Sequence, residues 1–396
     1  MNHVLKRWKS SQIRSKMKSY REALENYFIE GRPLIEVGPG LKAFSLLSPP
    51  LGSPAAKRRL RIIAENLTAP VALPGAGKRD PWGKRIPHTI TAAITYDCQC
   101  DCLHCSAHQY REEVAQSHSA LSFTELSGAI EQAVELGTTC VVLTGGEPLL
   151  HPDLYDLIRS VDKRRSVCTL FTNGELLAPA VVKELKDAGL FGAFVSLDYA
   201  DPGLHDQNRR RPGIFTKAVE GIRRCQEAGI LTGISTYATK DKIQSGQIDA
   251  LMELGRKLKA LEMFIFDAIP TGRLHEAHEC ALGEEEVKAI RNLRRFYNEK
   301  PEYPRIIHQT MFMSMTYPCI AEGCPAGVVQ VHLRANGDVS PCDFTPYSFG
   351  NIRMQPLSEI WRSMITDKLY EGHSPFCRMS RRDFRERLAA RSVGAS

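Results

Sequence analysis

The stretch Tyr96-Asp97-Cys98-Gln99-Cys100-Asp101-Cys102-Leu103-His104-Cys105 decides the fold of this chain. Cys98, Cys102 and Cys105 follow the spacing Cys-x3-Cys-x2-Cys, which places three thiolates in one short loop. A cubane iron–sulfur cluster normally takes four cysteines, so three would leave one iron open for a substrate or cosubstrate. The spacing therefore predicts a cluster that binds a second molecule.

Zinc is the main alternative for this loop, because zinc accepts mixed thiolate and imidazole ligands. The residues available to it are Cys100, Cys102, His104, Cys105 and His108. A disulfide is disfavoured, since no secretory signal precedes the loop and the other cysteines are scattered. In the cluster interpretation Cys100 has no ligand role, and we expect its thiol to point away from the metal.

Composition indicates an ordinary globular protein. The 396 residues are 43% hydrophobic and 24% charged, which leaves room for one large domain and a smaller one. The sequence contains no uninterrupted run of 18 apolar residues, so we expect no membrane-spanning helix. Twelve cysteines without a signal peptide point to a reducing, cytoplasmic location. The net charge of +7 accompanies no recognisable nucleic-acid motif, so we expect no nucleic-acid partner.

Residues 1–87 are expected to form a basic helical extension and a linker. The first 21 residues hold seven Lys or Arg and no acid, with apolar residues on one helical face from Ile13 to Phe28. We favour packing of this face on the main domain over peripheral contact with an anionic membrane surface. Residues 31–56 and 69–87 are rich in Gly and Pro, lack hairpin signals and predict extended connections. The basic run 57–61 is expected to be the solvated face of a short helix.

Residues 88–280 alternate between short apolar runs and segments of helical period. The predicted strands are Thr89–Tyr96, Cys140–Leu143, Val167–Phe171, Ala193–Leu197, Leu231–Tyr237 and Met263–Phe266. The predicted helices are Phe123–Leu136, Asp153–Val161, Pro179–Ala188, Phe215–Ala228 and Gln247–Leu258. Six strands alternating with helices imply a parallel α/β sheet, either a partial barrel or doubly wound. The cysteine loop follows the first strand, at the end where barrel enzymes place their chemistry.

Polar motifs follow several of these strands. Thr144-Gly145-Gly146-Glu147-Pro148 comes after the second, with glycines that permit close backbone approach and a carboxylate that could pair with an ammonium group. Thr172-Asn173-Gly174 ends the third strand and Ser196-Leu197-Asp198 the fourth, while Pro270-Thr271-Gly272-Arg273 follows the sixth. Arg209, Arg210 and Arg211 could contact an anion, but a solvated basic loop is the favoured interpretation.

The cysteine loop and these motifs, in this order, resemble the radical SAM enzymes. The resemblance implies a partial (β/α)6 barrel and a [4Fe-4S] cluster held by Cys98, Cys102 and Cys105. It also implies that S-adenosylmethionine binds the open iron. His104 would lie near its adenine, and Gly145, Gly146 and Glu147 would hold its amino group. Asn173 and Ser196 would line the pocket near its ribose and carboxylate.

Residues 281–396 carry a second cysteine set: Cys319, Cys324, Cys342 and Cys377. Asn336-Gly337 between apolar runs predicts a hairpin that places Cys324 and Cys342 on its two arms. With Gly350-Asn351-Ile352 and a helix through Trp361, this region resembles the SPASM and twitch extensions, which bind auxiliary iron–sulfur clusters. A full SPASM domain has seven cysteines, whereas four suffice for one cluster. Zinc or free thiols remain the alternative, and we expect Cys140, Cys168, Cys225 and Cys280 to be structural.

The resemblance implies a reductive cleavage of S-adenosylmethionine to a 5′-deoxyadenosyl radical, which abstracts hydrogen from a substrate carbon. The substrate would be a small metabolite, a tetrapyrrole or a peptide in a biosynthetic or maturation pathway. A reductase, flavodoxin or ferredoxin would supply electrons, and no general acid or base can be assigned. The alternative is a non-catalytic iron–sulfur or zinc protein that acts as an electron carrier or interaction module.

Overall fold

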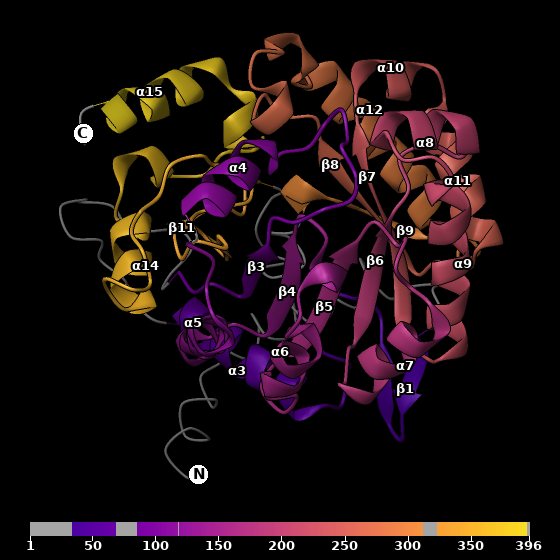
Figure 1. Ribbon diagram of the computed structural model, residues 1–396, viewed down its shortest axis with the longest axis horizontal. Helices are drawn as coiled ribbons and strands as arrows, with labels where there is room; N and C mark the ends of the chain where they lie inside the picture. The colour runs from indigo at the N-terminus through magenta and orange to yellow at the C-terminus, as the bar shows by residue number, and fades with distance from the viewer. Residues whose placement is uncertain (1–33, 69–84, 118, 312–322, 394–396) are drawn as a thin grey trace.

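The computed structural model describes residues 34–68, 85–117, 119–311 and 323–393 of the chain (Figure 1). The expected basic helix before Phe28 and the expected ligand Cys319 lie outside these residues. Within the described part of the chain, no helix is long and apolar enough to cross a membrane.

Six parallel strands in chain order form the centre of the fold. They are β3 (Thr89–Thr95), β4 (Cys140–Gly145), β5 (Val167–Thr172), β6 (Gly192–Ser196), β7 (Leu231–Ala238) and β8 (Glu262–Asp267). Each pairs in parallel with the next, so all six carboxyl ends meet at one edge of the sheet. The prediction of a mainly parallel α/β core from the alternation of apolar runs and helical segments is confirmed.

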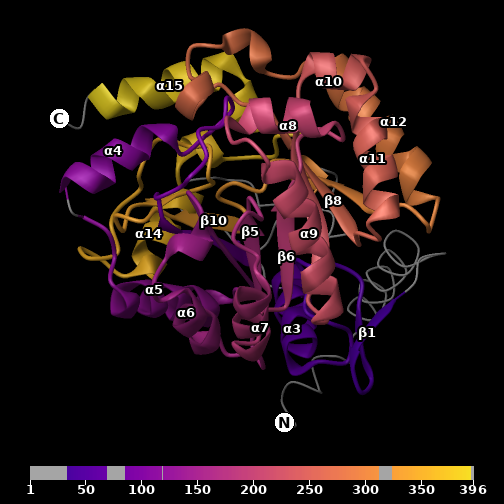
Figure 2. The same ribbon diagram turned by 45° about the vertical axis from the view of Figure 1, so that its right-hand side comes forward.

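Helices cover the outer face of this curved sheet (Figure 2). They are α5 (Phe123–Leu136), α6 (Leu154–Ser160), α7 (Pro179–Asp187), α9 (Ile214–Glu227), α11 (Gln247–Lys257) and α12 (Glu284–Asn298), while the short α8 (Pro202–Arg209) and α10 (Lys240–Gln244) lie at the carboxyl ends of the strands. Helix α5 begins with a capping box, in which the Ser122 hydroxyl and the Glu125 carboxylate each accept a backbone N–H of the other residue. The apolar faces of these helices and of the sheet form the largest core of the protein.

Both outer edges of the sheet come from the C-terminal third of the chain. Strand β9 (Arg305–His308) pairs with β8, and β10 (Gln330–Leu333) pairs in parallel with β3. The predicted hairpin is present, since β10 pairs antiparallel with β11 (Val339–Ser340) across Asn336-Gly337. The order of the nine strands is β11-β10-β3-β4-β5-β6-β7-β8-β9. Helices α14 (Leu357–Ile365) and α15 (Arg382–Val393) follow the hairpin.

The segment before the core closes the amino ends of the strands. Residues 31–56 were expected to be an extended connection without a hairpin. That expectation is wrong, because β1 (Ile35–Gly38) and β2 (Leu41–Ala43) pair antiparallel. The chain after them enters the sheet interior, where the backbone N–H of Leu46 donates to the buried Glu262 carboxylate at 2.8 Å. The hydroxyl of Thr169 donates to the carbonyl of Leu46 at 2.7 Å. This plug leaves the carboxyl ends of the strands as the open side.

Helix α3 (Pro54–Thr68) contains the basic run 57–61, which was expected to be solvated. That expectation is wrong for two of its arginines. Arg58 donates to the carbonyls of Thr138 and Val134 near the end of α5, and Arg59 is 5% exposed and donates to Leu47. Both guanidinium groups therefore donate to backbone carbonyls of neighbouring segments and tie α3 to the core.

Candidate functional site

The three-cysteine loop follows β3 at the carboxyl edge of the sheet. Cys98, Cys102 and Cys105 line one cavity of about 230 Å³, and Cys102 is buried. The end of α8 holds the loop through two backbone hydrogen bonds. The N–H of Asp101 donates to the carbonyl of Arg209 at 3.2 Å, and the N–H of Leu103 donates to the carbonyl of Asn208 at 3.0 Å. These backbone contacts fix a short irregular segment that has no secondary structure of its own.

Cys100 does not point away from this cavity, contrary to expectation. It is 1% exposed, and it lines the same cavity as the other three cysteines. A hydrogen bond from its thiol lowers the pKa of the Cys98 thiol to about 6. Its backbone N–H also donates to the Cys98 sulfur at 3.4 Å. The loop therefore brings a fourth thiol beside the three predicted ligands.

The two histidines of the zinc alternative both contact other side chains. The Nδ1 atom of His104 lies 3.3 Å from Asn208, and that of His108 lies 3.0 Å from Arg273. Both imidazoles are thus engaged with other side chains.

Gly145 and Gly146 bring the β4 loop into contact with the cysteine loop, and both line the cavity. The backbone N–H of Gly146 donates to Thr95 at 2.7 Å. A Cβ atom on Gly146 would lie 2.3 Å from the carbonyl oxygen of Asp97, so no larger residue fits. Gly145 has φ +138°, a conformation that glycine adopts readily. The two glycines therefore permit the close approach that a cosubstrate cradle requires.

The Glu147 carboxylate lies behind the cavity and does not line it. It is fully buried and accepts hydrogen bonds from the Thr172 hydroxyl at 2.7 Å, the Asn173 backbone N–H at 2.8 Å and the Leu149 N–H at 3.1 Å. Burial raises its pKa to about 7. In this structure Glu147 therefore positions the β5 loop. The side chain of Asn173 does line the cavity, with its Nδ2 3.9 Å from the Cys98 sulfur, and Ser196 lines it as well.

His104 lies at the cavity wall beside a residue that the sequence analysis missed. Its imidazole stacks on the ring of Tyr237 at the end of β7, with centroids 3.8 Å apart. The Tyr237 hydroxyl donates to Asn208 at 2.9 Å, and Asn208 also contacts His104. Burial lowers the pKa of His104 to about 3, so the imidazole is neutral. The sequence feature that could have identified Tyr237 as a cavity residue is its position at the carboxyl end of a predicted core strand.

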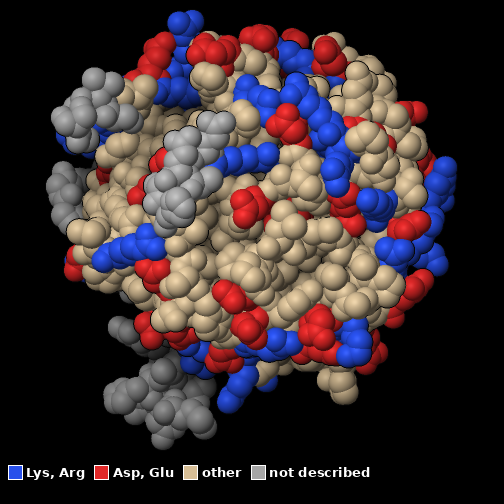
Figure 3. Space-filling model, in the orientation of Figure 1, with Lys and Arg blue, Asp and Glu red and all other residues tan. Residues whose placement is uncertain are grey.

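Of the three arginines at the end of α8, which were expected to form a solvated loop, Arg210 and Arg211 are partly exposed but Arg209 is not. Arg209 is buried, and its Nε donates to the Asp198 carboxylate at 2.8 Å. Arg210 pairs with Asp101, and Arg211 pairs with Glu175. On the face seen in Figure 3, Lys and Arg side chains are likewise interspersed with Asp and Glu. The arginines thus tie α8 to the cysteine loop and to the β5 loop.

The turn after β8 closes on the last cysteine of the loop. Gly272 has φ +56°, and a Cβ atom there would lie 2.3 Å from the carbonyl oxygen of Cys105. The same carbonyl accepts the backbone N–H of Arg273 at 3.0 Å, while the Arg273 side chain pairs with Asp101. The first and the sixth core strands are therefore joined through this loop.

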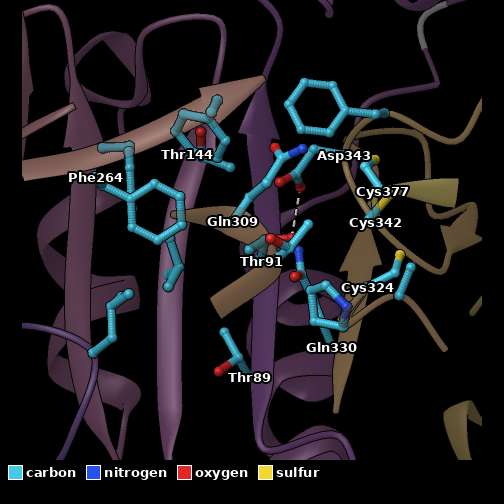
Figure 4. Close-up of a pocket in the computed structure, with 18 residues that line it drawn as sticks. Thr89, Thr91, Thr144, Phe264, Gln309, Cys324, Gln330, Cys342, Asp343 and Cys377 are labelled. Carbon is cyan, nitrogen blue, oxygen red and sulfur yellow. Dashed lines mark hydrogen bonds between the residues drawn. The ribbon is translucent and has the colours of Figure 1, made fainter. Parts of the chain in front are cut away.

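Cys324, Cys342 and Cys377 line a second, apolar cavity of about 90 Å³ (Figure 4). All three are buried. A hydrogen bond from the Cys377 thiol lowers the pKa of Cys324 to about 6, whereas burial raises that of Cys342 to about 12. Cys140, Cys168 and Cys225 are buried in the core and Cys280 is partly exposed, away from both cavities.

One wall separates the two cysteine sets. The residues that line both cavities are Thr144, Phe171, Phe266, Asp343 and Phe344. The Asp343 carboxylate lies 2.5 Å from Nδ1 of His332 and accepts the Thr91 hydroxyl at 2.6 Å, the bond dashed in Figure 4. A molecule bound in the first cavity would therefore lie against the wall of the second.

Comparison with known proteins agrees with this geometry. Residues 93–243 match the model of the radical SAM superfamily, and residues 324–385 match that of the SPASM iron–sulfur cluster-binding domain. The chain is 30% identical to the AdoMet-dependent heme synthase of Methanosarcina barkeri over 297 residues, which cover 70% of this chain and 82% of that protein. The chain belongs to the radical SAM superfamily.

A further relative and a solved structure are also similar to this chain. The Fe-coproporphyrin III synthase of Methanosarcina barkeri is 26% identical over 313 residues, covering 70% of this chain and 74% of that protein. Among solved structures, SuiB of Streptococcus suis bound to its precursor peptide SuiA superposes with a TM-score of 0.59 at 18% identity. That match covers 80% of this chain and 70% of SuiB, and it supports the fold.

A radical SAM domain with a SPASM extension uses a [4Fe-4S] cluster, S-adenosylmethionine and auxiliary iron–sulfur binding. The residues present fit these groups. Three thiols in one loop face a cavity edged by the two glycines and by Asn173, and three more cysteines line the neighbouring cavity. The first set would hold the cluster that binds the cosubstrate, and the second would hold an auxiliary cluster.

Proposed function

We propose that this radical SAM protein oxidises a carbon of a tetrapyrrole in a haem-type biosynthetic pathway. The observation that carries the proposal is the wall of five residues shared by the two cysteine-lined cavities. When bound, the clusters and S-adenosylmethionine supply a 5′-deoxyadenosyl radical for hydrogen abstraction and an acceptor for the electron that the substrate then loses. A substrate bound between the two cysteine sets could undergo both the hydrogen abstraction and the electron loss without leaving the cavity.

The residues of the chain would position the reactants and exclude water. His104, Gly145, Gly146, Asn173 and Ser196 edge the first cavity and would hold the cosubstrate. In the wall toward the second cavity, the rings of Phe171, Phe266 and Phe344 pack together with that of Phe264, and neighbouring centroids lie 4.5 to 5.9 Å apart. Such an apolar wall keeps water from a reactive carbon and strengthens the interactions of the polar groups around it.

Two observations favour a tetrapyrrole. The aromatic wall suits a flat, largely apolar macrocycle, because aromatic side chains stack on planar rings. In addition, two relatives that cover more than two thirds of this chain are named as a heme synthase and an Fe-coproporphyrin III synthase. A peptide substrate is the second candidate, supported by the likeness in fold to SuiB with its precursor peptide.

The remaining expectations also stand as proposals. We infer that a reductase, flavodoxin or ferredoxin supplies the electron that starts the reaction, and that the protein works in the cytoplasm. For the basic segment before Phe28, packing on the main domain stays the favoured interpretation, and peripheral contact with an anionic membrane surface is the alternative.

The test compares wild type with a Cys102→Ala variant, both reconstituted anaerobically with iron and sulfide. Each is incubated with S-adenosylmethionine, dithionite and either Fe-coproporphyrin III or a precursor-type peptide. We expect 5′-deoxyadenosine from wild type alone, together with an oxidised tetrapyrrole detected by mass spectrometry. Turnover of the peptide in place of the tetrapyrrole would support the second candidate. Absence of 5′-deoxyadenosine from folded, cluster-loaded wild type would favour the non-catalytic alternative.

A further inference from the structure

Two of the described residues that line the first cavity carry a permanent positive charge, Arg111 and Arg209. Arg209 is neutralised by Asp198 at 2.8 Å. The two other carboxylates of the cavity are engaged elsewhere. Asp267 is bound by His308 at 2.6 Å and by the side-chain amide of Gln309 at 2.8 Å, and Asp343 is bound by His332. Arg111 is therefore the cation of this wall that no described carboxylate pairs with, although its charge also acts on the sulfurs of Cys98 and Cys105.

The contacts of Arg111 leave most of its donors free. One terminal nitrogen donates to the backbone carbonyl of Cys100 at 3.0 Å. Its Nε is buried without a hydrogen-bond partner, and no described carboxylate lies within ion-pair distance. A guanidinium group has five N–H donors in a planar fork, so a single carbonyl does not satisfy it. A buried donor without a partner is costly, which indicates that a bound molecule completes the site.

The position of Arg111 on its helix supports the same conclusion. Helix α4 (His108–Ser117) begins three residues before Arg111, so the cation lies in the first turn. The amino end of a helix carries a partial positive charge, which disfavours a cation there and favours an anion. The adjacent Tyr110 stacks on Tyr96 of the cysteine loop at 5.4 Å and lies under the guanidinium of Arg334 at 4.7 Å. These contacts fix the helix between the cysteine loop and the C-terminal hairpin.

We infer that Arg111 binds a carboxylate group of the substrate and thereby sets which part of it faces the cysteine loop. This inference rests on the proposed function, and it narrows the substrate class to molecules that carry a carboxylate near the reacting carbon. The planar fork of arginine matches a carboxylate in two parallel hydrogen bonds, and the amino end of α4 adds backbone N–H groups of the same polarity.

The binding test uses coproporphyrin III, which carries carboxylates, and its tetramethyl ester as probes. Both are titrated into anaerobic, cluster-loaded protein that holds S-adenosylmethionine, with porphyrin absorbance as the readout. We expect wild type to bind the acid about tenfold more tightly than the ester. Arg111→Gln should lose this preference and Arg111→Lys should keep part of it, because lysine retains the charge without the fork. Arg159→Gln, on the exposed surface of α6, is the matched control.

A second readout does not depend on the tetrapyrrole. Phenylglyoxal modifies arginine, and mass spectrometry of the digested protein gives the extent at Arg111. Propionate should slow this modification and propionamide should not. If wild type binds neither porphyrin but propionate still protects Arg111, the carboxylate site stands and the tetrapyrrole proposal fails. The inference is overturned if the Arg111→Gln variant keeps the preference for the acid over the ester. It is also overturned if the only effect of the substitution is weaker S-adenosylmethionine binding or a shifted cluster potential.

Discussion

The imidazole of His104 and the phenol ring of Tyr237 stack with centroids 3.8 Å apart and planes 20° from parallel. The Lys242 ammonium lies 4.3 Å from the centroid of the same Tyr237 ring, so it must occupy the opposite face. Lys242 is 2% exposed and donates to the carbonyl of Tyr237 at 2.6 Å and to the hydroxyl of Thr236 at 3.2 Å. The cysteine loop, β7 and α10 thus meet in one stack at the cavity wall.

Replacing Lys242 should weaken cosubstrate binding. A desolvated cation–π contact contributes about 2 kcal/mol, so we expect Lys242→Met to loosen the Tyr237 ring and raise the Kd for S-adenosylmethionine about tenfold. Equilibrium dialysis of the cluster-loaded protein measures this constant. The exposed neighbour Lys240, on the same helix, supplies the control Lys240→Met. Equal affinities in the two variants would show that the stack does not support the cosubstrate.

The buried Glu147 carboxylate should make folding stability depend on pH. Burial raises its pKa from 4.5 to about 7, so the folded protein holds this proton more tightly than the unfolded chain does. Its contribution to the free energy of unfolding therefore falls by up to about 3 kcal/mol as the pH rises from about 4.5 to 7.

Urea denaturation of the iron-free protein at several pH values between 5 and 8 tests this prediction. Glu147→Gln should remove that part of the pH dependence, whatever constant cost the amide adds by facing the N–H of Asn173. Glu131→Gln, on the exposed side of α5, should retain the wild-type slope. Parallel pH profiles for wild type and Glu147→Gln would contradict the raised pKa.

A methyl group at Gly146 should break the contact between the β4 loop and the cysteine loop. The added Cβ would lie 2.3 Å from the Asp97 carbonyl and 2.5 Å from that of Tyr96, so the backbone must move. We expect Gly146→Ala to cost about 1–3 kcal/mol in stability and to lower iron retention by the loop. Gly128→Ala is the matched control, since nothing lies within 4 Å of its Cβ, and in helix α5 it should stabilise by about 0.5–1 kcal/mol. Full iron content in Gly146→Ala would contradict the prediction.

Iron content distinguishes one cluster from two. Wild type reconstituted anaerobically should bind about eight irons and eight sulfides, as two cubane clusters require. Replacing Cys98, Cys102 and Cys105 together with alanine should leave about four, and so should replacing Cys324, Cys342 and Cys377. The Cys280→Ala variant should keep the wild-type content. A value of about four in wild type that falls to none in the first variant would make the C-terminal set zinc-binding or structural.

The sequence by itself determined the local features. The six core strands from Thr89 to Phe266 and five of the helices between them were predicted within one or two residues, because period and capping residues act over a few positions. Helices α4, α8 and α10 were not predicted. The cysteine spacing and the turn at Asn336-Gly337 are equally local, and both indicated the correct family and hairpin. What a short segment encodes can be recovered from that segment.

Only the tertiary structure decided which distant residues meet. Leu46 closes the strands through Glu262, 216 residues away, although its segment resembled a linker. Arg209 is buried because Asp198 and the cysteine loop surround it, and Cys100 turns inward because the loop is held at Asp101 and Leu103. The wall shared by both cavities likewise depends on strands β3 and β10 lying side by side. Contacts between segments far apart in the sequence leave no periodic pattern in either segment, so these contacts can be seen only in the tertiary structure.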